Sequence, residues 1–419
     1  MTTLTYGPIT ACQICGSNDL RSVLFLGYLP PVNTMQTIGT AHDKQEWFPA
    51  EILRCPECSL VQLGYAADPN VLFPPDYPYR SGTTRILREN FADLQREAKA
   101  LLGLTNKDLI IDIGSNDGTL LKNFLDGGNR VLGVEPSLNA KLAEDMGVET
   151  KMTFFGSSVV EPILKSHGKA KVITAANVFA HIHGLDGIMK SIVALLEDDG
   201  VFISESHYLL DLLTTVQYDT IYHEHLRHYS VTSLRFLLER YGLTIFHAKR
   251  IPTHGGSIRV YASKSKRAVN ASVAAMLKEE EEAGLQGDAW VKPFRDRVLH
   301  SKLALYELLT KIKSSGKRIY AISAPSRAST LVNYVGLDDG IIDCVLEIQG
   351  SKKIGKYMPG RHSPVLDEAK LYQDQPEYAL LLSWHIGAEL MPNLKKRGFK
   401  GDFIVPLPEP RIMKNASFI

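Results

Sequence analysis

The sequence predicts an α/β protein built from three parts. Four of its five cysteines lie in a small N-terminal region punctuated by proline and glycine, which we expect to form a domain of its own. Beyond this region, short apolar runs alternate with helical patterns, as in parallel sheets covered by helices. The alternation occurs twice, on either side of a charged helical stretch. A chain of 419 residues is also too long for one ordinary hydrophobic core.

The composition is that of a soluble globular protein, with 44% apolar and 22% charged residues. The 47 basic and 46 acidic side chains nearly cancel, so bulk charge favours neither nucleic acid nor an anionic membrane as a partner. The sequence shows no signal-peptide pattern and no apolar run long enough to span a membrane. We therefore expect a cytoplasmic protein whose thiols stay reduced.

The first expected domain, residues 1–75, contains two C-x-x-C pairs. Each pair can present two thiolates from one tight turn, and two such turns complete a tetrahedral zinc site. Four thiolates leave no coordination position open, so we expect the zinc to be structural. Buried cysteines without a metal, or a redox pair, are the alternatives. The four expected ligands are Cys12, Cys15, Cys55 and Cys58.

A zinc ribbon can also bind nucleic acid, but the charge of this region argues against that use. Residues 1–80 carry four basic and seven acidic side chains, which is the wrong balance for binding phosphate. The fifth cysteine, Cys344, lies in an apolar run much further along the chain and is expected in a hydrophobic core.

The second expected domain, residues 76–265, contains four apolar runs that we interpret as strands of a parallel sheet. These runs cover residues 109–114, 131–136, 171–179 and 200–207. The third expected domain, residues 266–419, begins with the charged helical stretch and continues with a smaller sheet. Its expected elements are a helix or helix pair at 278–313, strands at 318–323, 343–348 and 378–384, and a helix near 326–335.

A glycine-containing turn follows the first strand of the central sheet, where Gly114 and Gly118 allow a ligand to approach the backbone. Glu135 ends the next strand, where a carboxylate can bind ribose hydroxyls. The spacing G-x-x-x-G is not the dinucleotide fingerprint, which disfavours NAD. The pattern D-x-G-x-x-x-G instead resembles motif I of Rossmann-like S-adenosylmethionine methyltransferases. The expected cofactor residues, some of which can equally cap the turn, are Asp112, Gly114, Asn116, Asp117, Gly118, Glu135 and Asn177.

Five of the thirteen histidines lie in two segments that follow strands, at 177–184 and 220–230. Both segments should reach the edge of the sheet that carries the cofactor turn. One alternative use is a second metal site, although the spacing does not match catalytic zinc motifs. Another is an ordinary place in the core or on the surface, above all for His183, His223 and His228. The three histidines of the metal alternative are His223, His225 and His228.

Carbon methylation beside a ketone has two chemical requirements that these segments can meet. A base must remove a C–H proton, and His225 suits this role because the pKa of histidine lies near neutral pH. The resulting enolate oxygen needs a hydrogen-bond donor, for which Tyr222 and His181 are available. Glu224 can fix the tautomer of the imidazole and raise its basicity.

Taken in chain order, the motifs resemble those of the nucleotide-hexose C-methyltransferases of unusual-sugar biosynthesis. The resemblance covers nearly the whole chain, and the YHEH and HGGS motifs together are its most specific part. The motifs are the two C-x-x-C pairs, Y-x-Y-x-S-G (Tyr77, Tyr79, Ser81, Gly82), DIGSNDG (112–118), N-x-x-x-H-I (Asn177, His181), YHEH (222–225) and HGGS-x-R (254–259).

The resemblance implies a zinc-binding N-terminal domain, a central Rossmann-like class I S-adenosylmethionine methyltransferase domain, and a C-terminal Rossmann-like domain that helps to hold a nucleotide sugar. It implies methylation at C3 of a nucleotide-linked 4-keto-6-deoxyhexose, with dTDP favoured over GDP. It also implies that His225 is the general base. The residues implied to support the substrate and the enolate are Tyr222, Glu224, His181 and one of Tyr77 and Tyr79. We expect the enzyme to be a monomer.

Further substrate contacts are expected from the HGGS-x-R motif and from the C-terminal domain. They are His254, Gly255, Ser257, Arg259, Arg327 and Lys353. The C-terminal domain departs from the family pattern in two places, because Ser326-Arg327-Ala328 replaces Ala-Lys-Gly and Trp384-His385 replaces Trp-Asn. Both departures leave the nucleotide open. The alternative functions are methylation of nitrogen or oxygen in another small molecule, and a non-enzymatic zinc ribbon that binds nucleic acid.

Overall fold

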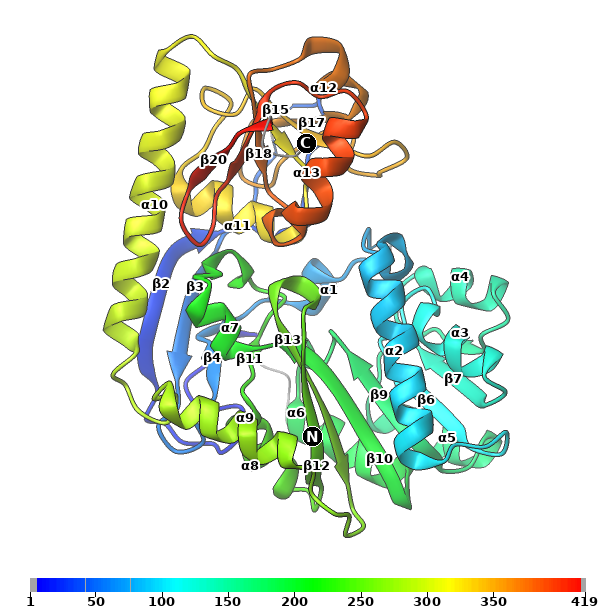
Figure 1. Cartoon of the computed structure of the whole chain (residues 1–419). Coiled ribbons are helices and arrows are strands. Elements are labelled where there is room, and N and C mark those ends of the chain that lie inside the picture. The colour runs from blue at the N-terminus through cyan, green and yellow to red at the C-terminus, as the bar shows by residue number, and fades with distance from the viewer. Residues whose placement is uncertain (1–5, 42, 76, 416–419) are drawn as a thin grey trace.

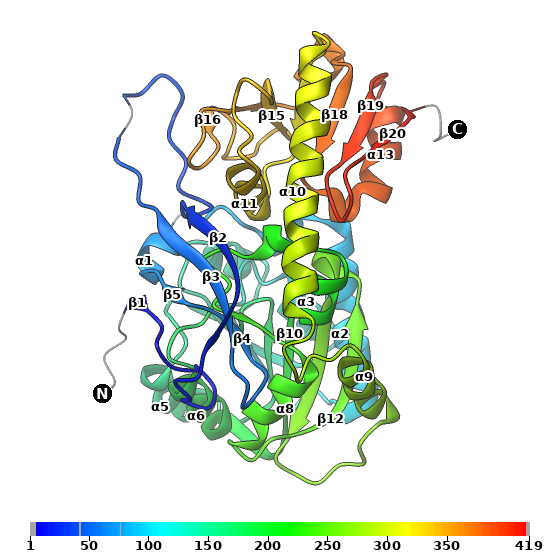
Figure 2. The same cartoon turned by 90° about the vertical axis from the view of Figure 1, so that its left-hand side faces the viewer.

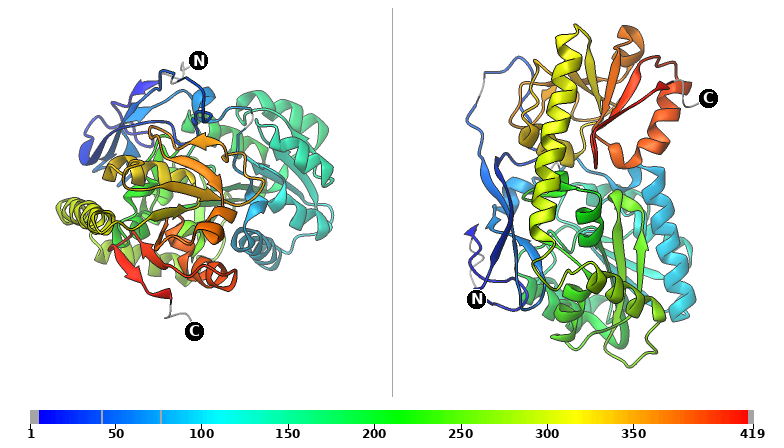
Figure 3. Two further views of the ribbon diagram at one scale, coloured as in Figure 1. Left: turned by 90° about the horizontal axis from the view of Figure 1, so that it is seen from above. Right: turned by 60° about the vertical axis from the view of Figure 1, so that its left-hand side comes forward.

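The structure is a computed structural model that describes residues 6–41, 43–75 and 77–415, and Figure 1 shows its three parts. An N-terminal sheet lies beside a larger central domain, and a second α/β domain is stacked on the central one (Figure 3). The predicted three-part α/β architecture is therefore confirmed. Residue 76, where the sequence predicts the start of the second domain, lies outside the described residues.

The N-terminal sheet has four strands in the order β11-β4-β3-β2, and all of its pairings are antiparallel. Three of these strands come from the cysteine-rich region, but β11 comes from the histidine-rich segment 220–230. The strands are β2 (Arg21–Leu29), β3 (Phe48–Arg54), β4 (Val61–Leu63) and β11 (Arg227–His228). A separate two-stranded ladder joins β1 (Gly7–Pro8) to β5 (Tyr65–Ala66).

The central sheet has seven strands in the order β12-β13-β10-β9-β6-β7-β8, and β13 is its one antiparallel strand. All five residues of β6 are buried, as expected for a parallel strand that is covered on both faces. The four predicted runs form β6, β7, β9 and β10, while β8 and the β12–β13 hairpin were not predicted. The bounds are β6 (Leu109–Ile113), β7 (Arg130–Val134), β8 (Thr150–Lys151), β9 (Ala170–Ala176), β10 (Leu196–His207), β12 (Thr244–Ile251) and β13 (Ser257–Ser263).

Helices cover both faces of the central sheet. On one face, α2 and α3 share a hydrophobic cluster with the buried side chains of β6, β7 and β9. On the other face, α5, α6 and α8 belong to the large cluster that continues into the N-terminal sheet. The helices of this domain are α2 (Arg85–Leu102), α3 (Thr119–Asp126), α4 (Asn139–Asp145), α5 (Ser157–Ser166), α6 (Leu185–Leu195), α7 (Leu209–Thr214) and α8 (Val231–Glu239).

The predicted helix pair and the second sheet are both present. Helices α9 (Ala271–Glu282) and α10 (Val291–Ser314) lead to a sheet in the order β16-β17-β15-β14-β18-β19-β20, whose two edge strands are antiparallel. Cys344 is buried in this sheet, as predicted. The strands are β14 (Ile319–Ile322), β15 (Cys344–Glu347), β16 (Lys356–Tyr357), β17 (Pro364–Asp367), β18 (Tyr378–Leu381), β19 (Asp402–Val405) and β20 (Arg411–Met413). The helices are α11 (Ser326–Val335), α12 (Ala369–Asp374) and α13 (Gly387–Lys396).

The N-terminal part contacts both of the other domains. Helix α10 runs along β2 and continues upward beside the C-terminal domain (Figure 2). The segment between β2 and β3 also extends to the C-terminal domain, where the Ile38 amide donates to the Gly355 carbonyl at 2.9 Å. The three parts are therefore packed as one body around the central domain. Within the described part of the chain, every helix is too short or too polar to cross a membrane.

Candidate active site

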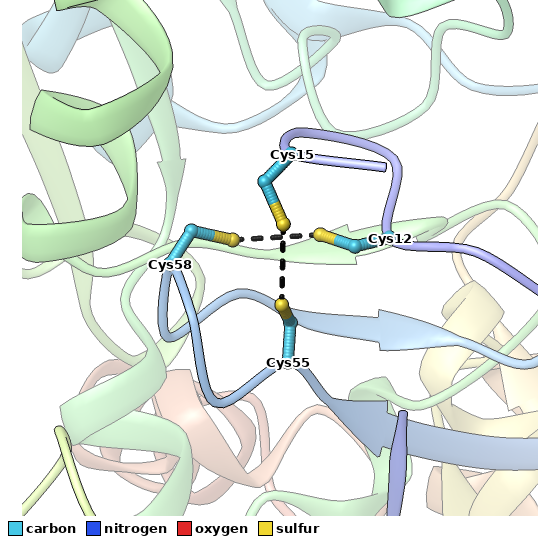
Figure 4. Close-up of side chains that lie close together, drawn as sticks. All are labelled: Cys12, Cys15, Cys55 and Cys58. Carbon is cyan, nitrogen blue, oxygen red and sulfur yellow. Dashed lines mark hydrogen bonds between the residues drawn. The ribbon is translucent and has the colours of Figure 1, made fainter. Parts of the chain in front are cut away.

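The four cysteines predicted to bind zinc converge at one point, as Figure 4 shows. Their sulfur atoms all lie within 4.8 Å of one another, and the Cys12–Cys58 and Cys15–Cys55 pairs are both 3.4 Å apart. Sulfurs at about 2.3 Å from a tetrahedral zinc ion lie about 3.8 Å apart, so the cluster fits this metal. It is the one group of three or more potential metal ligands in the described ranges. The alternative site at His223, His225 and His228 is therefore not supported.

The turn after β6 contains two glycines in the left-handed conformation. Gly114 has φ +65°, and a Cβ there would lie 2.5 Å from a methyl group of Val178. Gly118 has φ +78°, and a Cβ there would lie 2.7 Å from that of Ala143. Both positions therefore require glycine, for conformation and for space. At both positions the space beside the backbone is already filled by a neighbouring side chain, so the turn packs closely against Val178 and Ala143.

Two carboxylates predicted to line the cofactor are fixed in place at the carboxyl ends of their strands. Glu135 accepts hydrogen bonds from the backbone amides of Asn116 and Ser137, at 3.0 and 2.9 Å. Asp112 is buried and accepts from the Thr174 hydroxyl at 2.6 Å, and burial raises its pKa to about 8. These contacts hold the edge of the sheet rigid around the glycine turn.

Asn116 and Asp117 have a role that the sequence did not indicate. The Asn116 side chain accepts from the Ser81 amide at 2.9 Å, and Asp117 accepts from the Gly82 amide at 2.8 Å. Both side chains thereby fasten the Y-x-Y-x-S-G segment over the cofactor turn. Asn177 shows the opposite pattern, because both of its side-chain polar atoms are buried without a partner among the described residues. Such unpaired atoms beside the glycine turn fit a polar ligand such as S-adenosylmethionine.

His225 has one ring nitrogen bound and the other free. Its Nδ1 lies 2.7 Å from the carbonyl oxygen of Thr220, and a carbonyl can only accept, so Nδ1 carries the proton. The other nitrogen, Nε2, then holds an unshared electron pair. Burial, with the neighbouring His181, keeps the pKa of His225 well below its ordinary value. The neutral imidazole is the form that can accept a proton at neutral pH.

The rings around His225 come from its own segment, from the loop after β9 and from the end of β10, all at the carboxyl edge of the central sheet. The His225 ring centroid lies 4.1 Å from that of Tyr222, 4.8 Å from that of His181 and 4.7 Å from that of His207. His254 follows at 5.4 Å from His207. The prediction that the two histidine-rich segments meet at this edge is confirmed by these contacts.

Glu224 belongs to a different hydrogen-bond group from the one predicted for it. Its carboxylate accepts from the Tyr77 hydroxyl at 2.9 Å and from the Asn33 amide at 2.7 Å. It therefore does not fix the tautomer of His225, a task that the Thr220 carbonyl performs. Burial raises the pKa of Glu224 to about 7 despite these two donors.

The two tyrosines of the Y-x-Y segment are now distinguishable. Tyr77 is half-buried, donates to Glu224 and packs its ring against Phe73, which in turn stacks on His181 at 5.9 Å. Tyr79 is 40% exposed. Tyr77 is therefore the tyrosine that lies within the histidine cluster.

One of the predicted substrate residues is placed elsewhere. Arg259 is fully buried on β13, directly opposite Glu205 of β10. All of its N–H groups donate to acidic or amide groups, so none is available for a substrate, and the prediction for this residue is wrong. Its acceptors are Glu205, Asp93, Glu97 and Asn90.

Arg327 is placed at the contact between the C-terminal and central domains. It forms a two-pronged pair with the fully buried Asp219, at 2.8 Å for both bonds, and also donates to Gln217 and to the His254 carbonyl. Four of its five N–H groups are thus used, and its guanidinium lies over the Trp384 ring. Arg327 therefore joins the two domains beside the site, and substrate contact is not its main role in this geometry.

The remaining predicted substrate residues lie near the site in different ways. His254 has φ +56°, an uncommon conformation for a side-chain-bearing residue, and its Nε2 is buried without a partner among the described residues. Gly255 packs against Gln217, and the Ser257 hydroxyl donates to the Thr253 carbonyl at 3.0 Å. Lys353 is half-buried and donates to the Ala324 carbonyl at 2.6 Å.

Several residues of the site were missed by sequence reasoning. His207 is the last residue of β10. Asn177 was selected because ligands bind at the carboxyl edge of the sheet, and the same rule could have identified His207. No comparable signal marks three other residues, because none of them belongs to a motif. They are Asn33, which acts through its side-chain amide, Thr220, which acts through its backbone carbonyl, and Arg227, which lies in a short strand. Of the histidines expected to be ordinary, His223 lies 3.2 Å from the Pro49 carbonyl and packs against Phe48, which fits that expectation.

Comparisons with known proteins agree with this arrangement. Three family descriptions match the chain in order: "Putative zinc binding domain" at 12–73, "Methyltransferase domain" at 84–248 and "C-methyltransferase C-terminal domain" at 252–408. The C-methyltransferase NovU of Streptomyces niveus is 33% identical over 416 residues, which is 98% of each chain.

Solved structures of other methyltransferases match a smaller part of the chain. Magnesium protoporphyrin IX methyltransferase from Synechocystis PCC 6803, with bound SAM, is 14% identical with a TM-score of 0.32, over 42% of this chain and 79% of that one. The glycopeptide N-methyltransferase MtfA is 13% identical with a TM-score of 0.33, over 42% of this chain and 96% of that one.

Proposed function

Because the chain belongs to the S-adenosylmethionine-dependent, zinc-binding C-methyltransferases, we propose that it methylates C3 of a nucleotide-linked 4-keto-6-deoxyhexose. One observation carries the proposal. His225 has its Nδ1 proton committed to the Thr220 carbonyl, which leaves Nε2 as a free base among the other aromatic and histidine rings of the site.

The reaction begins with proton removal from carbon. Nε2 of His225 takes the proton from C3, the electron pair of the C–H bond forms a C3–C4 double bond, and the carbonyl electrons move to the C4 oxygen. Burial keeps the pKa of His225 low, so the imidazole is neutral and able to accept the proton at physiological pH. The Thr220 carbonyl stabilises the positive charge that the ring then carries.

The negative charge on the enolate oxygen needs donors that keep their protons. Burial and the nearby Glu224 hold the pKa of Tyr222 well above its usual range, so its hydroxyl remains protonated and can donate. His181 supplies a second ring in contact with His225. Tyr77 is oriented by its hydrogen bond to Glu224 and completes this side of the site.

When bound, S-adenosylmethionine would supply a methyl group on a positively charged sulfur, and S-adenosylhomocysteine would be the neutral leaving group once C3 has taken the methyl group. We assign its binding to the turn at Gly114 and Gly118, to Glu135 and to the unpaired side chain of Asn177. The Y-x-Y-x-S-G segment is attached to this turn by the side chains of Asn116 and Asp117.

The sugar nucleotide is the part of the proposal that depends most on the family resemblance. Lys353 of the C-terminal domain supports it, because this half-buried ammonium group lies near Glu224. Burial lowers the pKa of Lys353, and the nearby carboxylates of Glu347 and Glu224 oppose that effect. We further propose that residues 1–75 bind zinc, that residues 76–265 transfer the methyl group, and that residues 266–419 help to hold the nucleotide, with dTDP favoured over GDP. We propose that the enzyme is a monomer in the cytoplasm.

The test uses dTDP- and GDP-linked 4-keto-6-deoxyhexoses that carry deuterium at C3. With S-adenosylmethionine present, mass spectrometry should show a product that has gained a methyl group and lost the deuterium, and His225→Asn should give neither change. Methylation with the deuterium retained would exclude C3 and would leave C5, the other carbon beside the C4 ketone, or an oxygen atom as the acceptor. No product from any keto-sugar of the panel would overturn the proposed substrate class.

A further inference from the structure

Arg227 is a buried cation that connects the two histidine-rich segments. It lies on β11, two residues after His225, and is 1% exposed. One Nη atom donates to the carbonyl oxygens of Phe179, at 3.1 Å, and of Ile182. These two carbonyls lie on either side of His181 in the chain. The guanidinium therefore binds the segment that contains His181, while the backbone of Arg227 lies two residues after His225 in the chain.

The other end of Arg227 is held by the zinc-binding turn. Its second Nη atom donates to the Gln13 side-chain oxygen at 2.6 Å. Gln13 lies between Cys12 and Cys15, and its side-chain nitrogen donates to the Leu226 carbonyl at 3.3 Å. The same carbonyl accepts from the Leu63 amide at 2.9 Å. The turn that presents two of the zinc ligands thus holds the residues that immediately follow His225.

We propose that Arg227 is a positioning residue that sets the distance between His181 and His225, and that the zinc-binding turn holds Arg227 in place through Gln13. This inference rests on the proposed function, since it assigns both histidines to the reaction. It gives the metal a task in catalysis without contact with the substrate. The zinc fixes the turn, the turn fixes Gln13 and Arg227, and Arg227 fixes two loops from different strands of the central sheet.

The charge of Arg227 supports a role beyond simple packing. Its three hydrogen-bond acceptors are a side-chain amide and two backbone carbonyls, none of which is charged. The guanidinium contributes, after burial, to lowering the pKa of His181 to about 3. A cation held near the histidine pair keeps His181 neutral, and a neutral His181 can donate from one ring nitrogen to an oxygen of the substrate.

The first experiment changes Gln13, which is only half-buried and is not a zinc ligand. Gln13→Met removes both bonds to 226–227, whereas Gln13→Glu keeps an oxygen acceptor for Arg227. Ser17→Ala, on the same turn, removes only a hydroxyl that contacts the Asp19 amide and serves as the matched control. We expect Gln13→Met to lower kcat by roughly 10- to 100-fold. KM should change less than about threefold, and both Gln13→Glu and Ser17→Ala should stay within about threefold of wild-type kcat.

Zinc content by atomic absorption and Tm are measured for each variant, so that loss of metal is distinguished from loss of positioning. Gln13→Met with its full zinc content and wild-type kcat would overturn the inference. Loss of zinc from Gln13→Met would also count against it, because the proposal requires the turn to stay intact while its contact with Arg227 is lost.

A second measurement does not depend on the sugar substrate. Nitrogen-15 NMR of the histidine rings, with His181→Asn and His225→Asn to assign the signals, should show both rings shifted in Gln13→Met and unshifted in Ser17→Ala. Arg227→Gln, where it folds, should raise the pKa of His181. Unchanged ring signals in Gln13→Met would overturn the positioning role even if turnover were lowered. Shifted signals in a protein that methylates no keto-sugar would leave this inference standing and overturn the proposed function alone.

Discussion

Glu224 gives the most quantitative prediction, because a carboxyl group is buried there without a cationic partner in direct contact. Its carboxylate accepts one hydrogen bond from Tyr77 and one from Asn33. The variant Glu224→Gln keeps an oxygen acceptor for Tyr77. The introduced amide nitrogen replaces the oxygen that accepts from the Asn33 amide nitrogen. A flip of the Asn33 amide turns its side-chain oxygen, which has no partner among the described residues, toward this new donor. The substitution therefore removes the ionisable group with little change in shape.

The magnitude follows from the pKa of this group. Burial raises the pKa of Glu224 from 4.5 to about 7, so the folded protein keeps the proton to a higher pH than the unfolded chain does. This contribution to stability is fully present below about pH 4.5 and is lost as the pH rises through about 7. A tenfold change in proton affinity corresponds to about 1.4 kcal/mol, so the rise amounts to about 3 kcal/mol.

The assay is thermal unfolding of the wild type and of Glu224→Gln at pH 5.0 and pH 8.5, with Glu144→Gln as the control at an exposed carboxylate. We expect the Tm of Glu224→Gln relative to wild type to rise by several degrees between the two pH values, at roughly 2–4 °C per kcal/mol for a domain of this size. Glu144→Gln should show no such dependence. An equal Tm difference at both pH values for Glu224→Gln would refute the reasoning.

Three further predictions concern the base, the metal and the buried ion pair. His225→Asn should lower kcat by at least about 10²-fold, since a positioned base contributes about 10²–10⁴, while S-adenosylmethionine binding measured by calorimetry stays unchanged; near-normal turnover would exclude His225 as the base. Cys55→Ser removes one of the four thiolates, and we expect loss of zinc by atomic absorption together with a lower Tm; full zinc content would contradict the four-thiolate site. Arg259→Gln leaves the fully buried Glu205 without its cation and should reduce the free energy of unfolding by about 3–5 kcal/mol in a denaturant titration. Lys190→Gln, which breaks an exposed pair with Asp186, should cost less than about 1 kcal/mol, and equal losses for the two variants would contradict this account.

The parts of the site that depend on local chemistry could be predicted from the sequence. Two C-x-x-C turns are sufficient to specify four thiolates, and the left-handed turn at Gly114 follows from a strand that ends in D-x-G. The meeting of the two histidine segments follows from the rule that parallel strands end at one edge of the sheet. These inferences need only the order of the elements along the chain.

The parts that depend on strand register and on packing between domains could not be predicted. Arg259 is placed beside Glu205 by the antiparallel pairing of β13 with β10, and a shift of one residue would have pointed its side chain to the other face. Arg327 is held by Asp219 across a domain contact that no local pattern indicates. The partner of His225 is the Thr220 backbone carbonyl, and a carbonyl has no sequence signature.

Strand β11 has a consequence for hybrid enzymes made by exchanging parts between relatives. The sheet that contains the zinc-binding turns is completed by two residues that lie more than 150 positions further along the chain. In a hybrid that takes only the first 75 residues from a relative, β2, β3 and β4 would come from the relative, whereas the edge strand β11 would still come from this protein. An exchange of this sheet therefore has to include two separate stretches, the N-terminal region and the segment 220–230, and we expect substitutions in one to be accompanied by matching substitutions in the other.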